Sequence, residues 1–184
     1  MADRVGGADG SVDDVADPLR LNAVELLRQP GAVRDVDVVV DPSAIDVDHE
    51  RLTGDVSVAI RLVALNDGIE ASGAVSAPWA TVCRRCLTDI AGTAIADVEE
   101  LYRPERDGEI LDADAVPIHG GQLDLGPLAR ESILLELDVE RVCRDDCAGL
   151  CPVCGVDRND VECACDTSVR DDRWAALGEI VLDD

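Results

Sequence analysis

The sequence predicts an α+β fold, in which an antiparallel β-sheet is packed by one or two helices and followed by a C-terminal cysteine-rich segment. Three observations predict it: alternating apolar residues on both sides of a turn, an apolar stripe at helical spacing further along the chain, and eight cysteines in two groups. The length of 184 residues favours one domain. Hydrophobic residues make up 47% of the chain, and the absence of Phe makes the expected core aliphatic.

The N-terminal part of the chain changes character near Pro18. Residues 1–17 mix Gly, Asp and Ala without periodicity, so we expect a disordered acidic tail, whereas 18–184 is expected to form the single domain. Leu19–Leu27 is expected to be a short helix or an extended lead-in. Asp35–Val40 alternates and then becomes fully apolar, which is typical of a strand that enters a core.

The clearest strand signal lies in the next stretch. Apolar residues recur at every second position in Val56–Ala64 and again in Ile69–Ala77. Asn66–Gly68 separates the two runs, and its Gly tolerates positive φ. This pattern predicts a β-hairpin. A further strand is expected from about Ile90 to Tyr102, so that the preceding cysteine pair lies at the connection between two antiparallel strands.

A surface loop and two helices are expected beyond these strands. Arg103–Gly121 is rich in charge, Gly and Pro and is typical of a loop. Asp124 is well placed to cap a helix that runs to about Leu135, with Pro127 tolerated in its first turn. The apolar stripe of that helix would comprise Leu125, Leu128, Ala129 and Leu135. Residues 171–182 have the pattern of a second amphipathic helix.

Charge and hydropathy restrict the function classes. The chain has 16 basic and 40 acidic residues, a net charge of −24 that repels phosphate backbones and disfavours a broad nucleic-acid binder. Basic partners are favoured instead. No stretch approaches the roughly 18 consecutive apolar residues of a membrane helix. The N-terminus lacks the apolar core of a signal peptide, so we expect a cytoplasmic protein without a membrane association.

The cysteines carry the chemistry that the sequence predicts. They are Cys83, Cys86, Cys143, Cys147, Cys151, Cys154, Cys163 and Cys165. In a reducing compartment such paired spacing indicates metal binding rather than disulfides or free core thiols. Eight thiolates make two complete tetrahedral sets, so we expect two structural Zn²⁺ sites, with 143–165 as the zinc-binding segment. Redox catalysis is a rival use of a C-x-x-C pair, but it usually needs an exposed thiol at a helix N-terminus.

The sequence leaves the division of ligands between the two ions open. The favoured division joins the pairs Cys83/Cys86 and Cys143/Cys147, and leaves a second, local site within 151–165, because a local set closes a short loop at little entropic cost. The rival division builds a zinc ribbon from Cys83/Cys86 and Cys151/Cys154, so that the remaining four cysteines become partners.

Residues beside the cysteines are assigned secondary roles, and no catalytic set is found. Arginines at 84, 85, 141, 144 and 158 can offset the charge of about −2 on a zinc tetrathiolate, or face a partner. His49 and His119 are expected to be solvated rather than ligands. The chain has no phosphate loop, G-x-S-x-G or H-E-x-x-H, and four thiolates leave zinc no open position for water, so we expect no enzyme.

The sequence resembles the YceD family of large ribosomal RNA subunit accumulation proteins. The blocks that carry the resemblance are CRRCL at Cys83–Leu87, LDLGPLARESILLEL at Leu123–Leu137, CRDDCAGLCPVCG at Cys143–Gly155, Cys163-Ala164-Cys165, and DDRWAAL at Asp171–Leu177. The similarity covers roughly residues 20–182. One departure is Arg158, which stands where the family has the Leu of a Leu-Asn pair.

The resemblance implies a non-enzymatic role in 23S rRNA accumulation and assembly of the large ribosomal subunit. Combined with the net charge, it predicts action through protein contacts, with a basic ribosomal protein or a large-subunit assembly intermediate as the partner. Direct rRNA contact would be confined to an Arg-bearing face beside the metal. Two alternatives are a zinc-containing thiol redox or redox-switch protein, and an interaction module without a ribosomal role.

Overall fold

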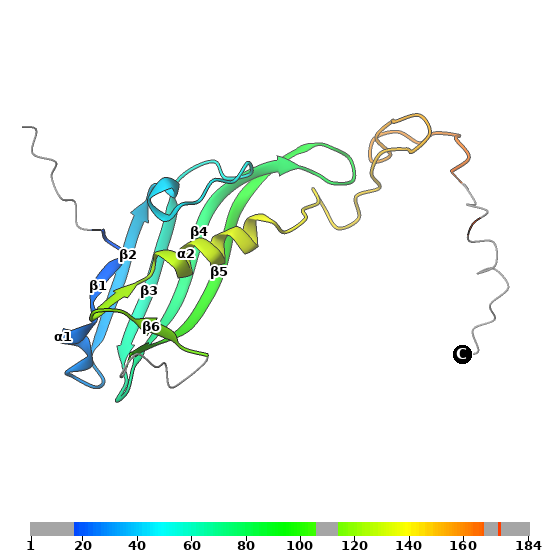
Figure 1. Ribbon diagram of the computed structural model, residues 1–184. Helices are drawn as coiled ribbons and strands as arrows, with labels where there is room; N and C mark the ends of the chain where they lie inside the picture. Colours follow the sequence, from blue (N-terminus) through cyan, green and yellow to red (C-terminus); the bar gives the residue numbers. More distant parts are fainter. Residues whose placement is uncertain (1–16, 106–113, 168–172, 174–184) are drawn as a thin grey trace, which may run out of the picture.

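The computed structural model describes residues 17–105, 114–167 and 173 (Figure 1). In chain order, the elements are β1 (Arg20–Asn22), α1 (Ala23–Leu27), β2 (Val33–Val40), the 3-10 helix η1 (Pro42–Ile45), β3 (Val56–Ala64), β4 (Ile69–Val82), β5 (Asp89–Pro104), β6 (Val116–Ile118), β7 (Gln122–Asp124) and α2 (Gly126–Leu137). Apart from Asp17 and Arg173, the expected N-terminal tail and the C-terminal helix lie outside the described residues.

A five-stranded sheet in the order β2-β3-β4-β5-β6 forms the body of the molecule. Its neighbours are antiparallel except β5 and β6, and β1 pairs with β7 in a separate two-stranded ribbon. The helix α2 lies across one face of the sheet (Figure 1). This arrangement confirms the predicted α+β class. The predicted hairpin is confirmed as well, because Ala64 pairs with Ile69 across the turn.

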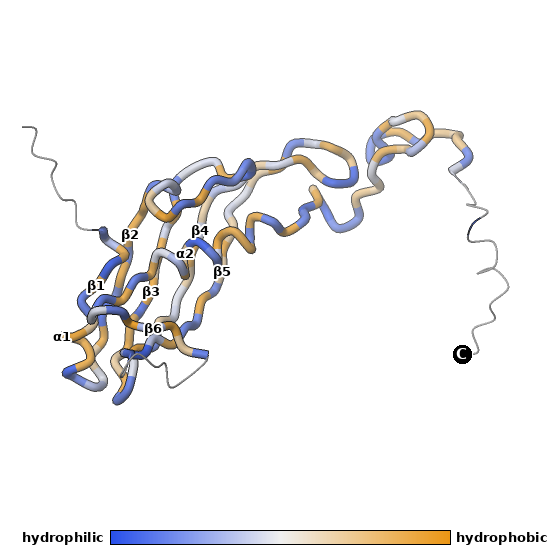
Figure 2. Tube along the Cα trace, viewed as in Figure 1, coloured by the Kyte–Doolittle hydropathy of each residue, from blue (hydrophilic) through white to orange (hydrophobic). Residues whose placement is uncertain are grey.

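The hydrophobic core lies between this face of the sheet and α2. The alternating residues of β3, from Val56 to Ala64, are each at most 2% exposed. From α2, the helix contributes Ala129, Ile133 and Leu137, which recur every four residues and therefore lie on one face. Figure 2 shows apolar positions recurring along the strands and the helix. The core is aliphatic as expected, with Tyr102 as a buried aromatic side chain.

The structure corrects two predictions about α2. Leu135 was expected in the buried stripe but is 73% exposed, because the run Ile133-Leu134-Leu135 permits more than one helical phase and the sheet selects the phase of Ile133. The helix also begins at Gly126, one residue later than expected, with Leu125 rather than Asp124 at the N-cap position. Asp124 ends β7, and its Oδ1 still accepts from the backbone N of Gly126 at 2.8 Å, as a capping side chain would.

The prediction of a loop over Arg103–Gly121 is wrong in part. β5 continues to Pro104, and Val116–Ile118 forms β6, which pairs in parallel with the end of β5. A strand of three residues is too short to show a periodic pattern. Its place at the sheet edge is set by backbone hydrogen bonds rather than by the alternation of its side chains.

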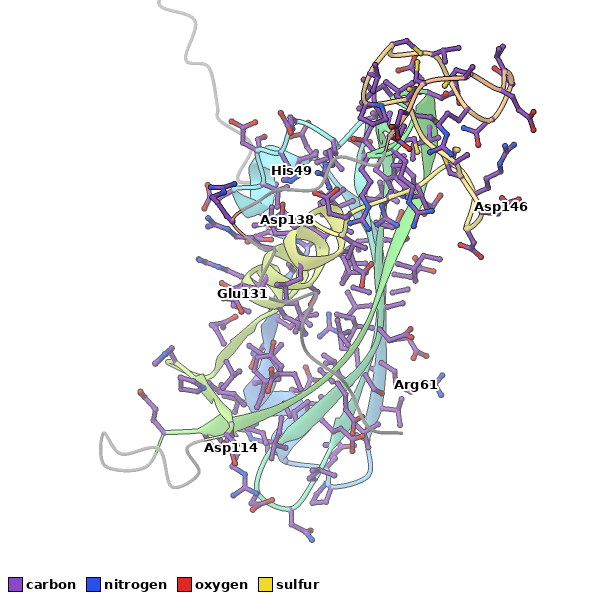
Figure 3. All side chains as sticks on the ribbon, turned by 90° about the vertical axis from the view of Figure 1, so that its right-hand side faces the viewer. His49, Arg61, Asp114, Glu131, Asp138 and Asp146 are labelled. Carbon is purple, nitrogen blue, oxygen red and sulfur yellow. The ribbon has the colours of Figure 1, made fainter. Side chains whose placement is uncertain are left out.

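The outer face of the sheet, opposite α2, carries acidic side chains. Asp35 and Asp37 of β2 and Asp97 and Glu99 of β5 are exposed on this face. Arg61 of β3 pairs with Asp35, its Nε lying 2.8 Å from a carboxylate oxygen, and projects away from α2 (Figure 3). The central strands contribute mainly Ser and Ala here, so the large side chains of this face lie on the outer strands β2 and β5, where Val39 and Ile95 are exposed beside the carboxylates.

The β4–β5 hairpin is much longer than its neighbours and extends beyond the sheet (Figure 1). The indole ring of Trp79 in β4 packs against Gly92 of β5 within this extension. The packing is so close that a Cβ at Gly92 would lie 2.8 Å from the ring. The guanidinium of Arg141, from the segment after α2, stacks over the same ring at 4.4 Å from its centroid. The hairpin tip is therefore held against the chain that follows the helix. Among the described residues, no helix combines the length and the apolar character that crossing a membrane requires.

Candidate metal centres

The eight cysteine sulfurs gather into two groups of four. Cluster 1 comprises Cys83, Cys86, Cys143 and Cys147, and cluster 2 comprises Cys151, Cys154, Cys163 and Cys165. Within each cluster, all four sulfurs lie within 4.8 Å of one another. Each group could hold a metal ion. The membership is that of the division favoured from the sequence, and the zinc-ribbon division is not the one that the fold brings together.

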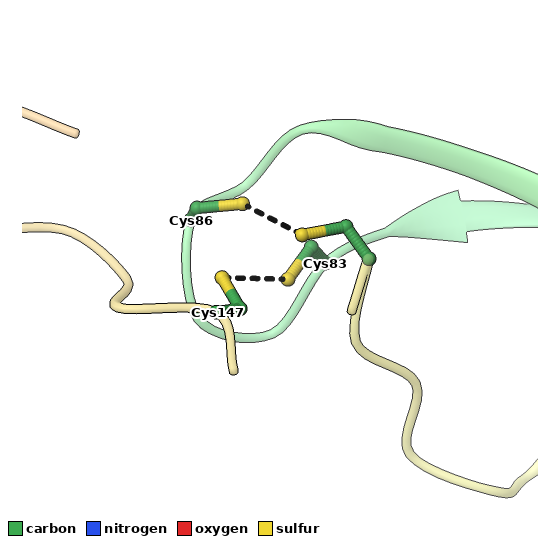
Figure 4. Close-up of side chains that lie close together, drawn as sticks. Cys83, Cys86 and Cys147 are labelled. Atoms are coloured by element: carbon green, nitrogen blue, oxygen red, sulfur yellow. Dashed lines mark hydrogen bonds between the residues drawn. The ribbon is translucent and has the colours of Figure 1, made fainter. Parts of the chain in front are cut away.

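Cluster 1 joins two parts of the chain that are distant in the sequence (Figure 4). Cys83 and Cys86 lie at the tip of the β4–β5 hairpin, and Cys143 and Cys147 lie in the segment after α2. The Sγ atoms of Cys83 and Cys147 are 3.9 Å apart, and those of Cys86 and Cys143 are 3.6 Å apart. A tetrahedron with metal–sulfur bonds of about 2.3 Å has edges of about 3.8 Å, whereas a disulfide needs about 2.0 Å. The spacing fits a metal ion.

The first cysteine pair of cluster 1 and the first pair of cluster 2 adopt the same turn. The amide of Leu87 donates to the carbonyl of Cys83 at 2.9 Å, and the amide of Gly155 donates to that of Cys151 at 2.8 Å. The amide of the first cysteine in each turn donates to the carbonyl five residues later, at 2.8 Å in both. Leu87 and Gly155 share a left-handed backbone, with φ of 62° and 73°. The structure thus contains two matched turns, each of which presents two cysteines to a cluster.

Because position 155 has a left-handed backbone, a side chain added there is expected to weaken metal binding at cluster 2. Gly155→Ala meets no atom within 4 Å, so only the conformational cost of about 1 kcal/mol applies. We expect metal affinity at cluster 2 to fall about fivefold, measured by chelator competition. The reciprocal change Leu87→Gly relieves the same strain and should leave cluster 1 as tight as before or tighter. If Gly155→Ala bound metal at cluster 2 as tightly as the wild type does, the predicted backbone strain at position 155 would be wrong.

Backbone amides favour the ionised form of one cysteine thiol in each cluster. Burial raises the pKa of the Cys83 thiol, but the backbone amides of Cys86 and Cys143 outweigh it and lower that pKa to about 6. The amides of Cys154 and Val153 likewise lower the pKa of Cys151 to about 6.

Two other thiols, those of Cys143 and Cys165, resist ionisation because of neighbouring cysteine sulfurs. The neighbouring sulfur of Cys147 raises the pKa of Cys143 to about 12, and the sulfur of Cys154 raises that of Cys165 to about 12. Four negative sulfurs at these distances repel one another strongly in a partly buried site. They can therefore be ionised together only around a cation, which is the chemistry of a metal site.

The flanking arginines mainly fix the chain that carries the ligands. Arg85 donates to the backbone carbonyl of Cys147 at 3.2 Å, and Arg141 donates to that of Glu136 at 2.7 Å. These two arginines therefore bind backbone oxygens. Arg84 and Arg158 are exposed, so they are available to solvent or a partner.

Neither histidine belongs to a cluster. His119 is exposed, as expected, and pairs with Glu105 at 3.1 Å. His49 was expected to be solvated, but its side chain is only 16% exposed and its Nε2 lies 3.2 Å from a carboxylate oxygen of Asp138 (Figure 3). The loop that carries His49 packs at the end of α2, where local sequence gives no sign of burial.

One residue of the site was not predicted. Asn159 lies in the cluster 2 loop, and its side chain Nδ2 is 3.4 Å from the Sγ of Cys147 in cluster 1. This contact lowers the pKa of Cys147. An amide side chain inside a cysteine-rich loop was the only signal in the sequence, and such a side chain is equally common at an ordinary turn.

The fold and the two clusters define a small α+β protein with two four-cysteine groups that could each hold a metal ion. The sequence model described as large ribosomal RNA subunit accumulation protein YceD matches residues 71–181. The chain therefore belongs to the YceD family.

Similar proteins occur in mycobacteria. Uncharacterized proteins of Mycobacterium tuberculosis and Mycobacterium bovis are each 31% identical over 180 residues, which is 91% of this chain and 83% of the relative. An uncharacterized protein of Mycobacterium leprae is 28% identical over 145 residues, 75% of this chain and 66% of the relative. No solved structure matches the chain significantly.

Proposed function

We propose that this protein is a non-enzymatic, cytoplasmic accessory factor in ribosome biogenesis that supports 23S rRNA accumulation and assembly of the large ribosomal subunit. The observation that carries the proposal is the match of the YceD family over residues 71–181, since that family is described by the accumulation of large-subunit ribosomal RNA. The match includes both cysteine clusters, so the metal centres belong to the part of the chain that defines the family.

The ion proposed for each cluster is Zn²⁺ in a structural role. Zinc prefers tetrahedral thiolate sites, and a four-cysteine set is typical of structural zinc. A bound ion would supply the positive charge that holds four thiolates together. At cluster 1, this would fasten the tip of the β4–β5 hairpin to the segment after α2. Four protein ligands leave no position for water, which supports a role without catalysis.

The partner proposed is a basic protein of the assembling large subunit. The net charge of −24 opposes contact with phosphate backbones, and the outer face of the sheet carries the exposed carboxylates of Asp37, Asp97 and Glu99 beside the paired Asp35. Such a face complements Lys- and Arg-rich surfaces. Any direct rRNA contact would use the exposed Arg84 and Arg158 beside the clusters.

A binding experiment separates protein from RNA as the partner. Purified basic large-subunit proteins and 23S rRNA fragments are each titrated with the full chain over a range of salt. We expect binding to at least one ribosomal protein, weakened about tenfold by Asp97→Asn/Glu99→Gln, and weak binding to RNA. The control Asp48→Asn/Glu50→Gln removes the same charge from an exposed loop and should change affinity much less. Tight RNA binding with a steep salt dependence would contradict this partner.

The redox alternative has one observation in its favour, the lowered pKa of Cys83 and Cys151. Thiol exchange also requires access to the sulfur, and these two cysteines are 0% and 2% exposed. Rapid reaction of several cysteines in the native protein, without a chelator, would favour a redox protein over a structural metal protein.

A further inference from the structure

The side chain of Asn159 connects the two clusters. The residue lies between Cys154 and Cys163, in the loop that joins the two halves of cluster 2. Its Nδ2 donates to the Sγ of Cys147, a cluster 1 cysteine, at 3.4 Å. Its Oδ1 accepts from the backbone N of Ala148 at 2.8 Å. The amide group thus contacts both a sulfur of cluster 1 and the chain that leads from cluster 1 to cluster 2.

The position of Asn159 depends on the fold of cluster 2. The carboxylate of Asp157 accepts from the backbone N of Asn159 at 2.8 Å and from its Nδ2 at 2.7 Å, which fixes the direction of the side chain. Asp157 itself bridges to Leu150, and the amide of Arg158 donates to the carbonyl of Gly149 at 2.9 Å. The loop is anchored at both ends by cluster 2 cysteines. Loss of metal there would free those ends, and with them the amide that reaches Cys147.

The path between the clusters is short and closely packed. The amide of Leu150 donates to the carbonyl of Arg85, at the hairpin tip, at 2.9 Å. Gly149 has φ of 70°, and a Cβ there would lie 2.9 Å from the same carbonyl oxygen. Only a few residues separate Cys147 from Cys151, and these contacts tie them to the hairpin tip, so the connection between the clusters is short and packed rather than a flexible linker.

We infer that Asn159 is a positioning residue that couples the two metal centres, so that metal bound at cluster 2 tightens metal binding at cluster 1. Hydrogen bonds to a ligand from outside the metal's own ligand set typically change metal affinity by 10- to 100-fold. By thermodynamic linkage, metal at cluster 1 strengthens cluster 2 by the same factor. This inference rests on the proposed occupancy of both clusters by metal.

Substitutions at Asn159 separate coupling from ligation. Asn159→Ala leaves all eight cysteines in place, and we expect cluster 1 to bind metal about tenfold more weakly. Asn159→Asp is expected to have a larger effect, because it places a carboxylate against the Cys147 thiolate. Asp160→Ala, an exposed neighbour in the same loop, is the matched control and should leave cluster 1 unchanged.

The test uses the full chain loaded with ¹¹³Cd²⁺, which gives one NMR signal for each occupied site. Cys86→Ser identifies the cluster 1 signal by its loss, and chelator competition followed on that signal gives the affinity. We expect Asn159→Ala to shift the cluster 1 signal and to weaken that site about tenfold. Breaking cluster 2 with Cys163→Ser should weaken cluster 1 similarly. The double variant Asn159→Ala/Cys163→Ser should add little, since both act through one contact.

The outcomes distinguish this inference from the proposed function. If the wild type binds two metal ions and Asn159→Ala does not change the metal affinity of cluster 1, the inferred coupling is wrong. The proposal that both clusters bind metal would still be supported. If the losses add in the double variant, Asn159 does not carry the coupling between the clusters, and the inference is wrong. If the wild type binds no metal at either cluster, both the inference and the proposed zinc role fail.

Discussion

Stripping metal from the native protein is expected to release the segment from 138 to 165 while the sheet stays folded. The core between the sheet and α2 contains none of the described cysteines, whereas the apolar packing around cluster 1 is confined to Cys83, Cys86 and Cys147 with a few neighbours. Structural zinc in small peptides contributes roughly 10 to 16 kcal/mol of binding free energy, far more than so few contacts supply. Hydrogen exchange measures the effect: amides of 143–165 should exchange at least about 100-fold faster after chelation, with β3 and β4 unaffected.

Single-cysteine variants show which cluster fastens the segment. Cys83→Ser should release it even in excess zinc, because it breaks the cluster that reaches back to the hairpin. Cys165→Ser breaks only the local cluster and should leave the amides near Cys143 substantially more protected than Cys83→Ser does. Slow exchange of 143–165 in a chain proven to be free of metal would show that metal does not hold the segment.

Gly73→Ala is expected to be the most destabilising small substitution in the sheet. Gly73 lies in the middle of β4 between Ile60 and Val98, with φ of 156°. A Cβ there would lie 2.1 Å from the backbone oxygen of Ala59 and 2.9 Å from the Cα of Ile60. Because both contacts are to backbone, the central pair β3–β4 must separate. We expect a loss of about 3 kcal/mol or more in the free energy of unfolding, measured by denaturant titration.

Gly31→Ala is the matched control for Gly73→Ala. Gly31 also has a positive φ, 86°, but a Cβ there would meet nothing within 4 Å. Gly31→Ala should therefore lower the free energy of unfolding by only about 1 kcal/mol, because a residue with a side chain disfavours the left-handed backbone. If the two substitutions destabilised the protein equally, the close approach of β3 and β4 at Gly73 would be wrong.

The strongly periodic parts of the fold were predictable from the sequence. Alternation in Val56–Ala64 and Ile69–Ala77 defined both the hairpin and its buried face, since strands expose every second residue to the same side. The three-residue strands β1, β6 and β7 were not predictable, because their pairing depends on the backbone of distant segments. The phase of α2 was misjudged for a similar reason: consecutive apolar residues around Ile133 fit several helix faces, and only the sheet selects one.

The cysteines were predictable as a set, and loop-closure entropy favoured the grouping that the structure shows without deciding it. Spacing alone allowed a local cluster or a ribbon, and the choice depends on how α2 returns the chain to the hairpin tip. The equivalence of Leu87 and Gly155 was hidden as well, because an apolar residue gives no sign of a left-handed backbone. Asn159 was missed because the sulfur that it contacts belongs to the other cluster.

Metal analysis of natively purified protein, with Cys83→Ser measured beside the wild type, is the most direct test that the clusters are structural zinc centres. We expect about two zinc ions per wild-type chain and about one in Cys83→Ser, since one four-cysteine cluster then remains intact. A wild-type chain that is folded, has all eight thiols reduced and carries no transition metal would contradict the zinc centres and the architecture that they are proposed to hold.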